Sequence, residues 1–263
     1  MLWRDEHLVA VYKPAGWLVH RTGLDAGETR FVMQALRDQL GQHVFPVHRL
    51  DKGTCGVLVM ALHSEAARAL SQSFEAHRTR KHYLAVVRGW APRAIEVDHA
   101  LCPDDAPPDA PVQEAHTRFE RLATLALPPE PGQAAADPRY PASRLSLVQA
   151  WPSTGRRHQI RRHLKHLAHP IIGDATHGKG PVNRWWAERL GLQRLWLHAA
   201  TLDIPHPLSG EWLRFSSGLL DTGSPADQPL PPDLLAWQTL QQHPAWQADE
   251  PARPGLDTCE TRT

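Results

Sequence analysis

The sequence predicts a globular fold that mixes helices and strands, and three observations lead to this prediction. The chain has 263 residues, 41% hydrophobic and 22% charged, which is ordinary for a protein with a substantial core. Short apolar runs typical of buried strands alternate with segments whose apolar residues follow helical spacing. Turn-forming residues separate these segments. The length suits one large domain, or one domain followed by a tail.

The first predicted elements are a strand and a helix. The strand starts at His7 and ends at the turn signal KPAG. The helix covers residues 29–40, because Phe31 and Leu36 fall on one side of a helix there. We expect Gly41 to act as its C-cap.

The next three elements are a strand, a helix and a strand. Residues 57–62, VLVMAL, are predicted to form a buried strand. A helix is expected from Ser64, as its N-cap, to about His77. The segment RKHYLAVVRGW is then predicted to form a strand, with Tyr83 near its start.

Proline-rich segments interrupt this order. The stretches CPDDAPPDAP and LPPEPGQAAADPRYP lie on either side of the strand-like AHTRFERLATLAL and should be surface loops. After Ser217 the chain is dotted with Pro and Trp. We expect one short helix around residues 232–242, docked on the body, and disorder over the last dozen residues.

The composition also bears on the cellular compartment. No run approaches the roughly 18 apolar residues of a membrane span, and the opening MLWRDEHLVA carries charges where a secretory signal is apolar. Cys55, Cys102 and Cys259 are too few and too scattered for a disulfide framework. We therefore expect a cytoplasmic protein.

The net charge of +1 hides a segregation of charge. Residues 95–114 contain six acids and no Lys or Arg. Residues 156–169 contain five Lys or Arg, four His and no acid. The basic segment would attract a polyanion if its side chains share one face, and would otherwise be a solvated helical face. The sequence alone leaves both interpretations open.

The stretch HRLDKGTCG places Asp51 between Arg49 and Lys52. Such an acid, with an ordinary pKa of about 3.9, can be a salt-bridge partner, a metal ligand or a nucleophile. The four His of residues 156–169 suggest a metal, but interleaved arginines oppose a divalent cation, and zinc-type spacings are missing. No Walker or Rossmann phosphate loop is present, and GDATHGKG, residues 173–180, is expected to be a flexible loop.

A hydrolytic site with two carboxylates is disfavoured, because no second acid follows Asp51 until Glu65. A single acid suits covalent catalysis, in which the carboxylate attacks and is later released, and this favours an isomerase. An isolated Asp among basic residues is nevertheless more often structural than catalytic.

Four motifs together resemble one family. HRLDKGTCGVLVMAL resembles the catalytic motif of RluA-type pseudouridine synthases, KPAGWLVH their first motif, RKHYLAVVRG their tyrosine motif, and STGRRHQIRRHLKHLAHPIIGD their basic motif. LWLHAATLDIPHPLSGE is similar to their closing strand. The matches occur in family order over roughly residues 3–215. Cys55 stands where the family usually has serine, a nearly isosteric change that leaves the acid untouched.

This resemblance implies an α+β fold, in which a mixed, largely antiparallel sheet with flanking helices and loops surrounds a catalytic cleft. It implies a catalytic domain over residues 1–216 and an extension over 217–263, without the S4 RNA-binding domain of many relatives. Segments such as GQHVFPVHRLD and NRWWAERLGLQRLWLHAATL look like the family members that modify uridine 65 of tRNA. No cofactor or metal is implied, and we expect a monomer without an obligate protein partner.

The resemblance also implies residue roles. The residue matching Asp51 attacks the uridine at C1′ or C6, and the residue matching Arg161 pairs with it and keeps it ionised. The residue matching Tyr83 stacks on the flipped uracil, and the one matching Arg49 enters the RNA helix as the base leaves. Leu197 is expected to form an apolar floor beneath the base.

Four further cations of the basic motif are expected to face phosphates: Arg156, Arg157, Arg162 and Lys165. Two alternatives stay open beside a tRNA-modifying enzyme. The same chemistry could act on ribosomal RNA, since the catalytic motifs do not encode the target. The chain could also be a non-catalytic RNA-binding protein that uses its basic face.

Overall fold

The computed structural model describes residues 1–21, 27–103, 107, 110–137, 139–191, 193–221 and 230–249. Its strands are β1 (Trp3–Arg4), β2 (Leu8–Lys13), β3 (Phe45–Pro46), β4 (Cys55–Ala61), β5 (Arg80–Arg88), β6 (Ala94–Asp98), β7 (His116–Leu127), β8 (Ser143–Pro152), β9 (Leu197–Pro205), β10 (Trp212–Ser216) and β11 (Trp246–Ala248). Its helices are α1 (Val32–Leu40), α2 (Ser64–Glu75), α3 (Gln159–His166), α4 (Gly180–Leu190) and α5 (Pro232–Gln241).

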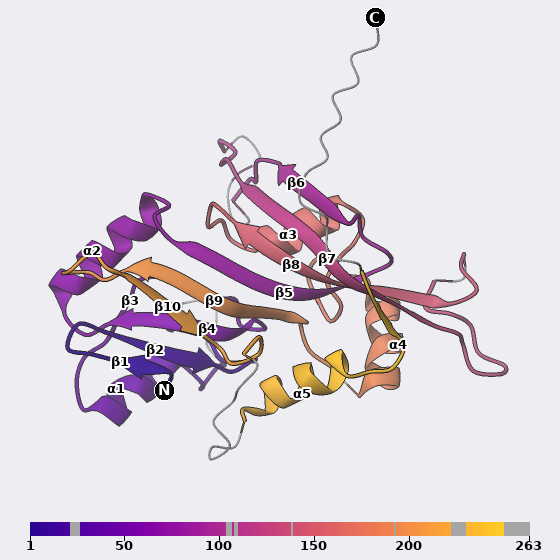
Figure 1. The fold of residues 1–263 in the computed structure, drawn as a ribbon, viewed down its shortest axis with the longest axis horizontal. Coiled ribbons are helices and arrows are strands. Elements are labelled where there is room, and N and C mark those ends of the chain that lie inside the picture. Colours follow the sequence, from indigo (N-terminus) through magenta and orange to yellow (C-terminus); the bar gives the residue numbers. More distant parts are fainter. Residues whose placement is uncertain are drawn as a thin grey trace, which may run out of the picture.

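All the described strands belong to one sheet, in the order β1-β2-β4-β9-β5-β8-β7-β11, with β3, β6 and β10 paired at its sides. Among these strand pairs, β4–β9 is parallel and the rest are antiparallel. Figure 1 shows α1 and α2 towards one end of the sheet and the long β7–β8 pair reaching out at the other. The expected mixed, largely antiparallel sheet with flanking helices is confirmed.

The parallel contact between β4 and β9 depends on Gly56. Gly56 lies opposite Ala199 and has φ +115°, a conformation that L side chains rarely adopt. A Cβ on Gly56 would lie 2.1 Å from the carbonyl oxygen of Ala199. Glycine therefore lets the two backbones meet directly after the loop that carries Asp51.

The apolar run of β4 is explained by cover on both faces of the sheet. Val57 and Val59 share a buried cluster with Leu70 of α2, whereas Leu58 shares another with Leu36 of α1. A strand that is buried on both faces reads as continuous hydrophobic sequence rather than as alternation. The run VLVMAL was predicted as such a strand, and it coincides with β4 to within two residues at its start and one at its end.

The helix boundaries agree with the sequence only in part: α1 begins at Val32, three residues after the predicted start, and α2 ends at Glu75, two residues before His77. Helix α1 ends at Gly41, which has φ 66° and donates its backbone N–H to the carbonyl of Arg37, as predicted for a C-cap. The prediction of Ser64 as the N-cap of α2 was wrong. His63 occupies that position in an extended conformation, and its ring accepts a hydrogen bond from the backbone N–H of Ala66.

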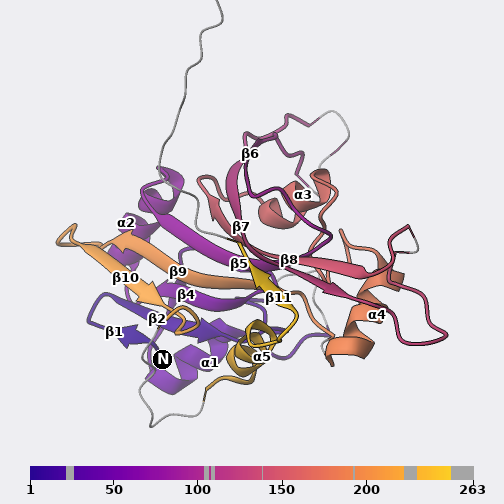
Figure 2. The same cartoon turned by 45° about the vertical axis from the view of Figure 1, so that its right-hand side comes forward.

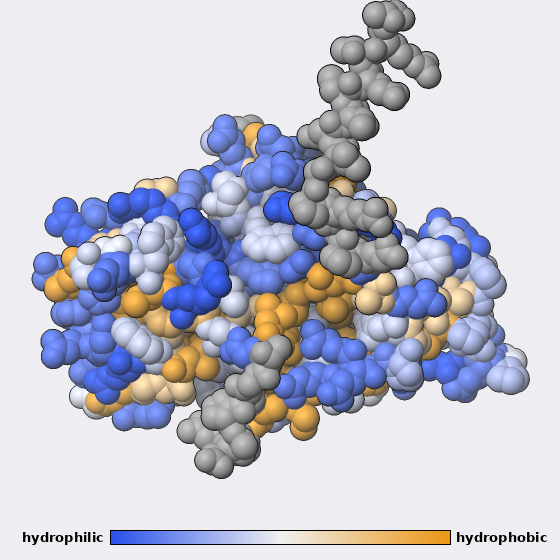
Figure 3. Space-filling model, in the orientation of Figure 1, coloured by the Kyte–Doolittle hydropathy of each residue, from blue (hydrophilic) through white to orange (hydrophobic). Residues whose placement is uncertain are grey.

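Helix α5 docks on the body, as predicted. Leu234, Trp237 and Leu240 are buried, and the Trp237 ring packs edge-on against Trp196 at 4.9 Å. Strand β11 extends the sheet beside β7 (Figure 2). On the face shown in Figure 3, hydrophobic residues reach the surface in the region of α5 and β11. The last dozen residues lie outside the described residues.

Two carboxylates, those of Asp233 and Asp249, attach this C-terminal segment to the body of the protein. The carboxylate of Asp233 pairs with Arg194 and accepts the backbone N–H of Ala15 at 2.9 Å. Arg121 of β7 holds Asp249 with two hydrogen bonds, at 2.6 and 3.1 Å.

Among the described residues, no helix has both the length and the apolar character that crossing a bilayer requires.

His198 of β9 is fully buried and packs against Trp237 of α5. Its Nδ1 lies 3.2 Å from Sγ of Cys55, and its Nε2 lies 2.7 Å from Oγ of Ser217. Burial, followed by the charge of Arg194, lowers the pKa of His198 to about 3. The imidazole is therefore neutral in the folded protein at physiological pH.

Replacing Trp237 by Ala should destabilise the protein by about 3–5 kcal/mol, because it opens a cavity where a fully buried indole packs. Urea unfolding measures this free energy. Leu235, on the same helix but 56% exposed, provides the control, and L235A should cost no more than about 0.5 kcal/mol. Equal effects of the two substitutions would contradict the docking of α5.

Stability should fall as the pH drops below 6.5, because His198 binds a proton in the unfolded chain but resists it when folded. Between pH 6.5 and the folded pKa of about 3, this one group should cost about 1.4 kcal/mol per pH unit. H198Q should remove this contribution, so that the free energy of unfolding changes less steeply with pH, by one bound proton, across this range. H43Q, at an exposed ring, is the control for replacing a histidine outside the core.

Candidate active site

A cavity of about 470 Å³ opens where three segments meet. Residues 47–54 line one side, residues 74–83 a second, and residues 152–161 a third, with Leu197 of β9 completing the wall. The predicted site residues that line it are Arg49, Asp51, Tyr83, Arg156, Arg157 and Arg161. The structure thus brings residues of the catalytic, tyrosine and basic motifs, and Leu197 of the closing strand, to one cavity.

The loop that carries Asp51 is held from behind by Lys13. The side chain of Lys13 is fully buried at the end of β2, and its Nζ donates to the carbonyls of Pro14, Lys52 and Thr54 at 3.0, 3.2 and 2.7 Å. Burial lowers the pKa of Lys13 to about 8, although Cys55, Asp51 and Asp233 oppose the shift. At neutral pH Lys13 is therefore a cation that fixes the backbone directly after Asp51, at Lys52 and Thr54.

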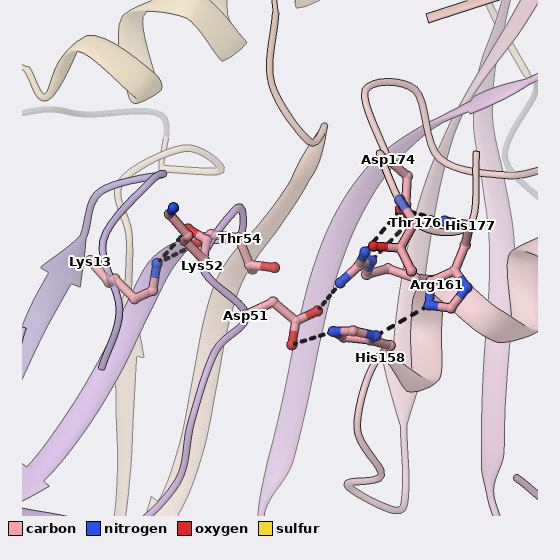
Figure 4. Close-up of polar contacts among 9 residues, drawn as sticks. All are labelled: Lys13, Asp51, Lys52, Thr54, His158, Arg161, Asp174, Thr176 and His177. Atoms are coloured by element: carbon pink, nitrogen blue, oxygen red, sulfur yellow. Dashed lines mark hydrogen bonds and ion pairs between the residues drawn. The ribbon is translucent and has the colours of Figure 1, made fainter. Parts of the chain in front are cut away.

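Arg161 joins Asp51 to a second, buried carboxylate. Its Nη1 donates to Oδ2 of Asp51 at 3.0 Å, while its Nε and Nη2 donate to Asp174 at 2.7 and 2.9 Å (Figure 4). Asp174 has no exposed side-chain surface. Burial alone would raise the pKa of Asp174, but hydrogen bonds from Arg161 and the loop backbone lower it overall. Taken alone, Arg161 would suggest an exposed cation, and that interpretation is wrong.

The second oxygen of Asp51 faces a pair of histidines. Nε2 of His158 lies 3.9 Å from Oδ1 of Asp51, and Nδ1 of His158 lies 3.2 Å from Nε2 of His177. His158 is the N-cap of α3, and His177 belongs to the turn before α4. The two oxygens of Asp51 thus have different neighbours, a guanidinium and an imidazole (Figure 4).

Tyr83 of β5 faces the cavity beside Asp51. Burial, followed by the charge of Asp51, raises the pKa of Tyr83, so its phenol stays neutral. Lys81 lines the same cavity, donates to the carbonyl of Thr154 at 2.7 Å, and has its pKa lowered to about 8 by burial and by Arg156. Burial likewise lowers the pKa of His48 to about 3, and its ring accepts the backbone N–H of Val59.

The predicted RNA-binding residues fall into two groups. Arg49, Arg157 and Lys165 are exposed, and the first two line the cavity. Arg156 donates to the backbone carbonyl of Glu114, and Arg162 to that of Cys102, at 2.9 and 2.6 Å. Arg156 and Arg162 therefore contact the backbone of the acidic segment, residues 95–114.

Sequence reasoning missed several residues at the site. Lys13 was assigned to a turn signal and to the family's first motif, but without a role. Residues 173–180 were expected to be a flexible loop, yet that loop supplies Asp174 and His177. Asp174 could have been identified from its position at the end of the basic motif that also contains Arg161. The described residues contain no group of three or more His, Cys, Asp or Glu placed to hold a metal ion.

Comparison with known proteins identifies the family. A sequence model of the family described as RNA pseudouridylate synthase matches residues 7–166. The chain belongs to this family. It is 48% identical over 224 residues to tRNA pseudouridine synthase C of Yersinia pestis, covering 82% of this chain and 85% of that protein. It is also 48% identical to tRNA pseudouridine synthase C of Salmonella typhimurium, over 84% of this chain and 86% of the relative.

Solved structures agree with this family membership. Human RNA Pseudouridylate Synthase Domain Containing 1 superposes with a TM-score of 0.63 at 25% sequence identity, covering 93% of this chain and 95% of that one. The resemblance inferred from the four motifs and the predicted fold class are both confirmed. As a pseudouridine synthase of the RluA type, the protein is an isomerase.

Replacing Asp174 by Asn should destabilise the protein by about 3–5 kcal/mol, because it leaves the buried Arg161 without its main counter-charge. Chemical unfolding at pH 7 measures the change. Asp203 is the matched control, since it also binds an arginine through two hydrogen bonds, but Arg214 is 71% exposed. D203N should cost no more than about 1 kcal/mol. Similar costs would show that burial does not set the strength of the Arg161 pair.

Proposed function

We propose that this protein converts uridine 65 of tRNA to pseudouridine, with Asp51 as the covalent nucleophile. The observation that carries the proposal is the ion pair of Asp51 with Arg161 at the wall of a 470 Å³ cavity. The high identity to tRNA pseudouridine synthase C of two bacteria supports tRNA as the substrate.

The reaction needs one ionised oxygen nucleophile and no external group. Asp51 attacks the uridine at C1′ or C6, the glycosidic bond breaks, and the base turns within the cavity. Carbon 5 then bonds to C1′, the proton on C5 leaves, N1 gains a proton, and the carboxylate is released. Arg161 favours the charged form of Asp51, because an opposite charge within hydrogen-bond distance stabilises the carboxylate.

The walls of the cavity suit a flipped uracil. Tyr83 offers a neutral aromatic ring for stacking, and Leu197 an apolar surface. His48 is uncharged at neutral pH, so it adds no cation opposite the base. Extruding a base from a stem costs a few kcal/mol, which the exposed side chain of Arg49 would offset in part by entering the helix.

The exposed cations would bind the tRNA backbone. The side chains of Arg157 at the cavity and of Lys165 on α3 are exposed and can reach phosphates. Arg156 and Arg162 would have to share their charge with the carbonyls they hold. We infer that the protein acts as a monomer in the cytoplasm, where its tRNA substrate resides.

Replacing Asp51 by Ala or Asn should lower pseudouridine formation on a tRNA transcript by at least about 10³-fold, because the nucleophile is lost. Release of a hydrogen label from C5 of uridine gives the rate, and base-resolved mapping gives the position. D38N, at an exposed carboxylate paired with Arg37, should keep the wild-type rate.

Two control substrates make this test specific. A transcript with cytidine at position 65 should gain no pseudouridine, and ribosomal RNA transcripts should stay unmodified. Modification of ribosomal RNA alone would overturn the tRNA assignment. Wild-type tRNA binding without any isomerisation would instead favour a non-catalytic RNA-binding protein.

A further inference from the structure

The carboxylate of Asp51 lies at one end of a row that continues through two imidazoles. Arg161 occupies Oδ2, and Oδ1 faces Nε2 of His158 at 3.9 Å. Nδ1 of His158 in turn lies 3.2 Å from Nε2 of His177 (Figure 4). The row joins Asp51 in the loop before β4, His158 at the N-cap of α3, and His177 in the turn before α4.

The contact between the imidazoles controls which nitrogen of His158 carries a proton. In a neutral pair, one of the two facing nitrogens donates and the other accepts. If His158 donates from Nδ1, its Nε2 directs a lone pair at the anionic Asp51, which is repulsive. If His177 donates from Nε2, His158 carries its proton on Nε2 and directs it towards Asp51. The charge of the carboxylate favours the second arrangement.

The backbone of His158 supports a dedicated orientation of this ring. His158 has φ 56° and ψ 21°, the left-handed region, which is unfavourable for a residue other than glycine. It is the N-cap of α3, yet its side chain makes no capping hydrogen bond. A strained residue whose side chain does not serve the helix is typical of functional sites.

His177 is anchored by the same carboxylate that anchors Arg161. Its backbone N–H donates to Oδ1 of Asp174 at 2.8 Å, and that of Thr176 does so at 2.9 Å. Arg161 binds Asp174 through two further hydrogen bonds. Asp174 therefore fixes both neighbours of Asp51, Arg161 directly and His158 through His177.

We propose that His177 is a positioning residue for the nucleophile: it donates to Nδ1 of His158 and so directs the Nε2–H of His158 at Oδ1 of Asp51. Asp51 is then oriented from both sides, by Arg161 and by His158. This role deepens the proposed function and rests on it. Misplacing a reacting group by about 1 Å can cost a factor of about 10² in rate, so the effect should appear in the chemical step.

The test compares His177→Ala with His177→Gln in single-turnover pseudouridine formation on tRNA. H177A should lower the single-turnover rate about 10- to 100-fold with the Kd for tRNA unchanged within about twofold. H177Q should recover the rate to within about threefold of wild type, because the amide of Gln can donate an N–H to Nδ1 of His158. Equal rates for wild type and H177A, or no recovery in H177Q, would overturn the proposal.

A second measurement does not depend on activity. The ¹⁵N shifts of the His158 ring, assigned by the signal missing in H158N, report which nitrogen is protonated. Wild type and H177Q should show the Nε2–H tautomer at neutral pH, and H177A should lose this single state. A Nδ1–H tautomer in wild type would overturn the proposal. Absence of activity in wild type on every RNA would instead refute the proposed function, while the tautomer would still test the positioning.

The matched control is a second pair of histidines remote from the cavity. Nδ1 of His7 lies 2.9 Å from Nε2 of His63, beside β2 and α2. H7A removes the same kind of contact, and it should leave the single-turnover rate within about twofold of wild type. A loss of rate in H7A as large as in H177A would show a general loss of stability, and would count against the proposal.

Discussion

The site depends on one guanidinium held between two carboxylates. A buried arginine is unfavourable unless its charge and its donors are satisfied, and Asp174 does both through a pair of hydrogen bonds. With its Nε and Nη2 held in this way, Arg161 presents its remaining edge to Asp51. The pairing stabilises Arg161 inside the protein and leaves the charge of Asp51 facing the cavity. Asp174 thus shapes the site without lining the cavity.

A second buried cation holds the opposite side of the loop. Lys13 donates to three backbone carbonyls, two of which directly follow Asp51, and it does so from the end of a strand that is itself buried. Because the hydrogen bonds run to the backbone, they fix the path of the loop rather than the identity of its side chains. Gly56 completes the arrangement by allowing β4 to approach β9 directly after the loop. The acid is therefore carried by a rigid turn between packed strands.

The C-terminal segment is connected to this arrangement from the far side of the sheet. Asp233 at the start of α5 accepts the backbone N–H of Ala15, only two residues beyond Lys13, and pairs with Arg194. Arg194 also approaches Sγ of Cys55, four residues after the acid. Packing of α5 is thus linked to the support of the loop through polar contacts as well as through its buried apolar side.

Local sequence determined the elements that periodicity and turn chemistry encode. The run VLVMAL became β4 because both faces are covered, and Gly41 ended α1 because a left-handed residue was needed there. The order of the motifs also determined the family and placed Asp51 and Arg161 in one site. Only the tertiary structure showed the further partners of these residues, because Asp174 binds Arg161, and Lys13 the loop of Asp51, through contacts that no local pattern encodes. It also decided that residues 173–180 contribute His177 to the site, since hydrogen bonds to Asp174, rather than local propensity, shape that turn.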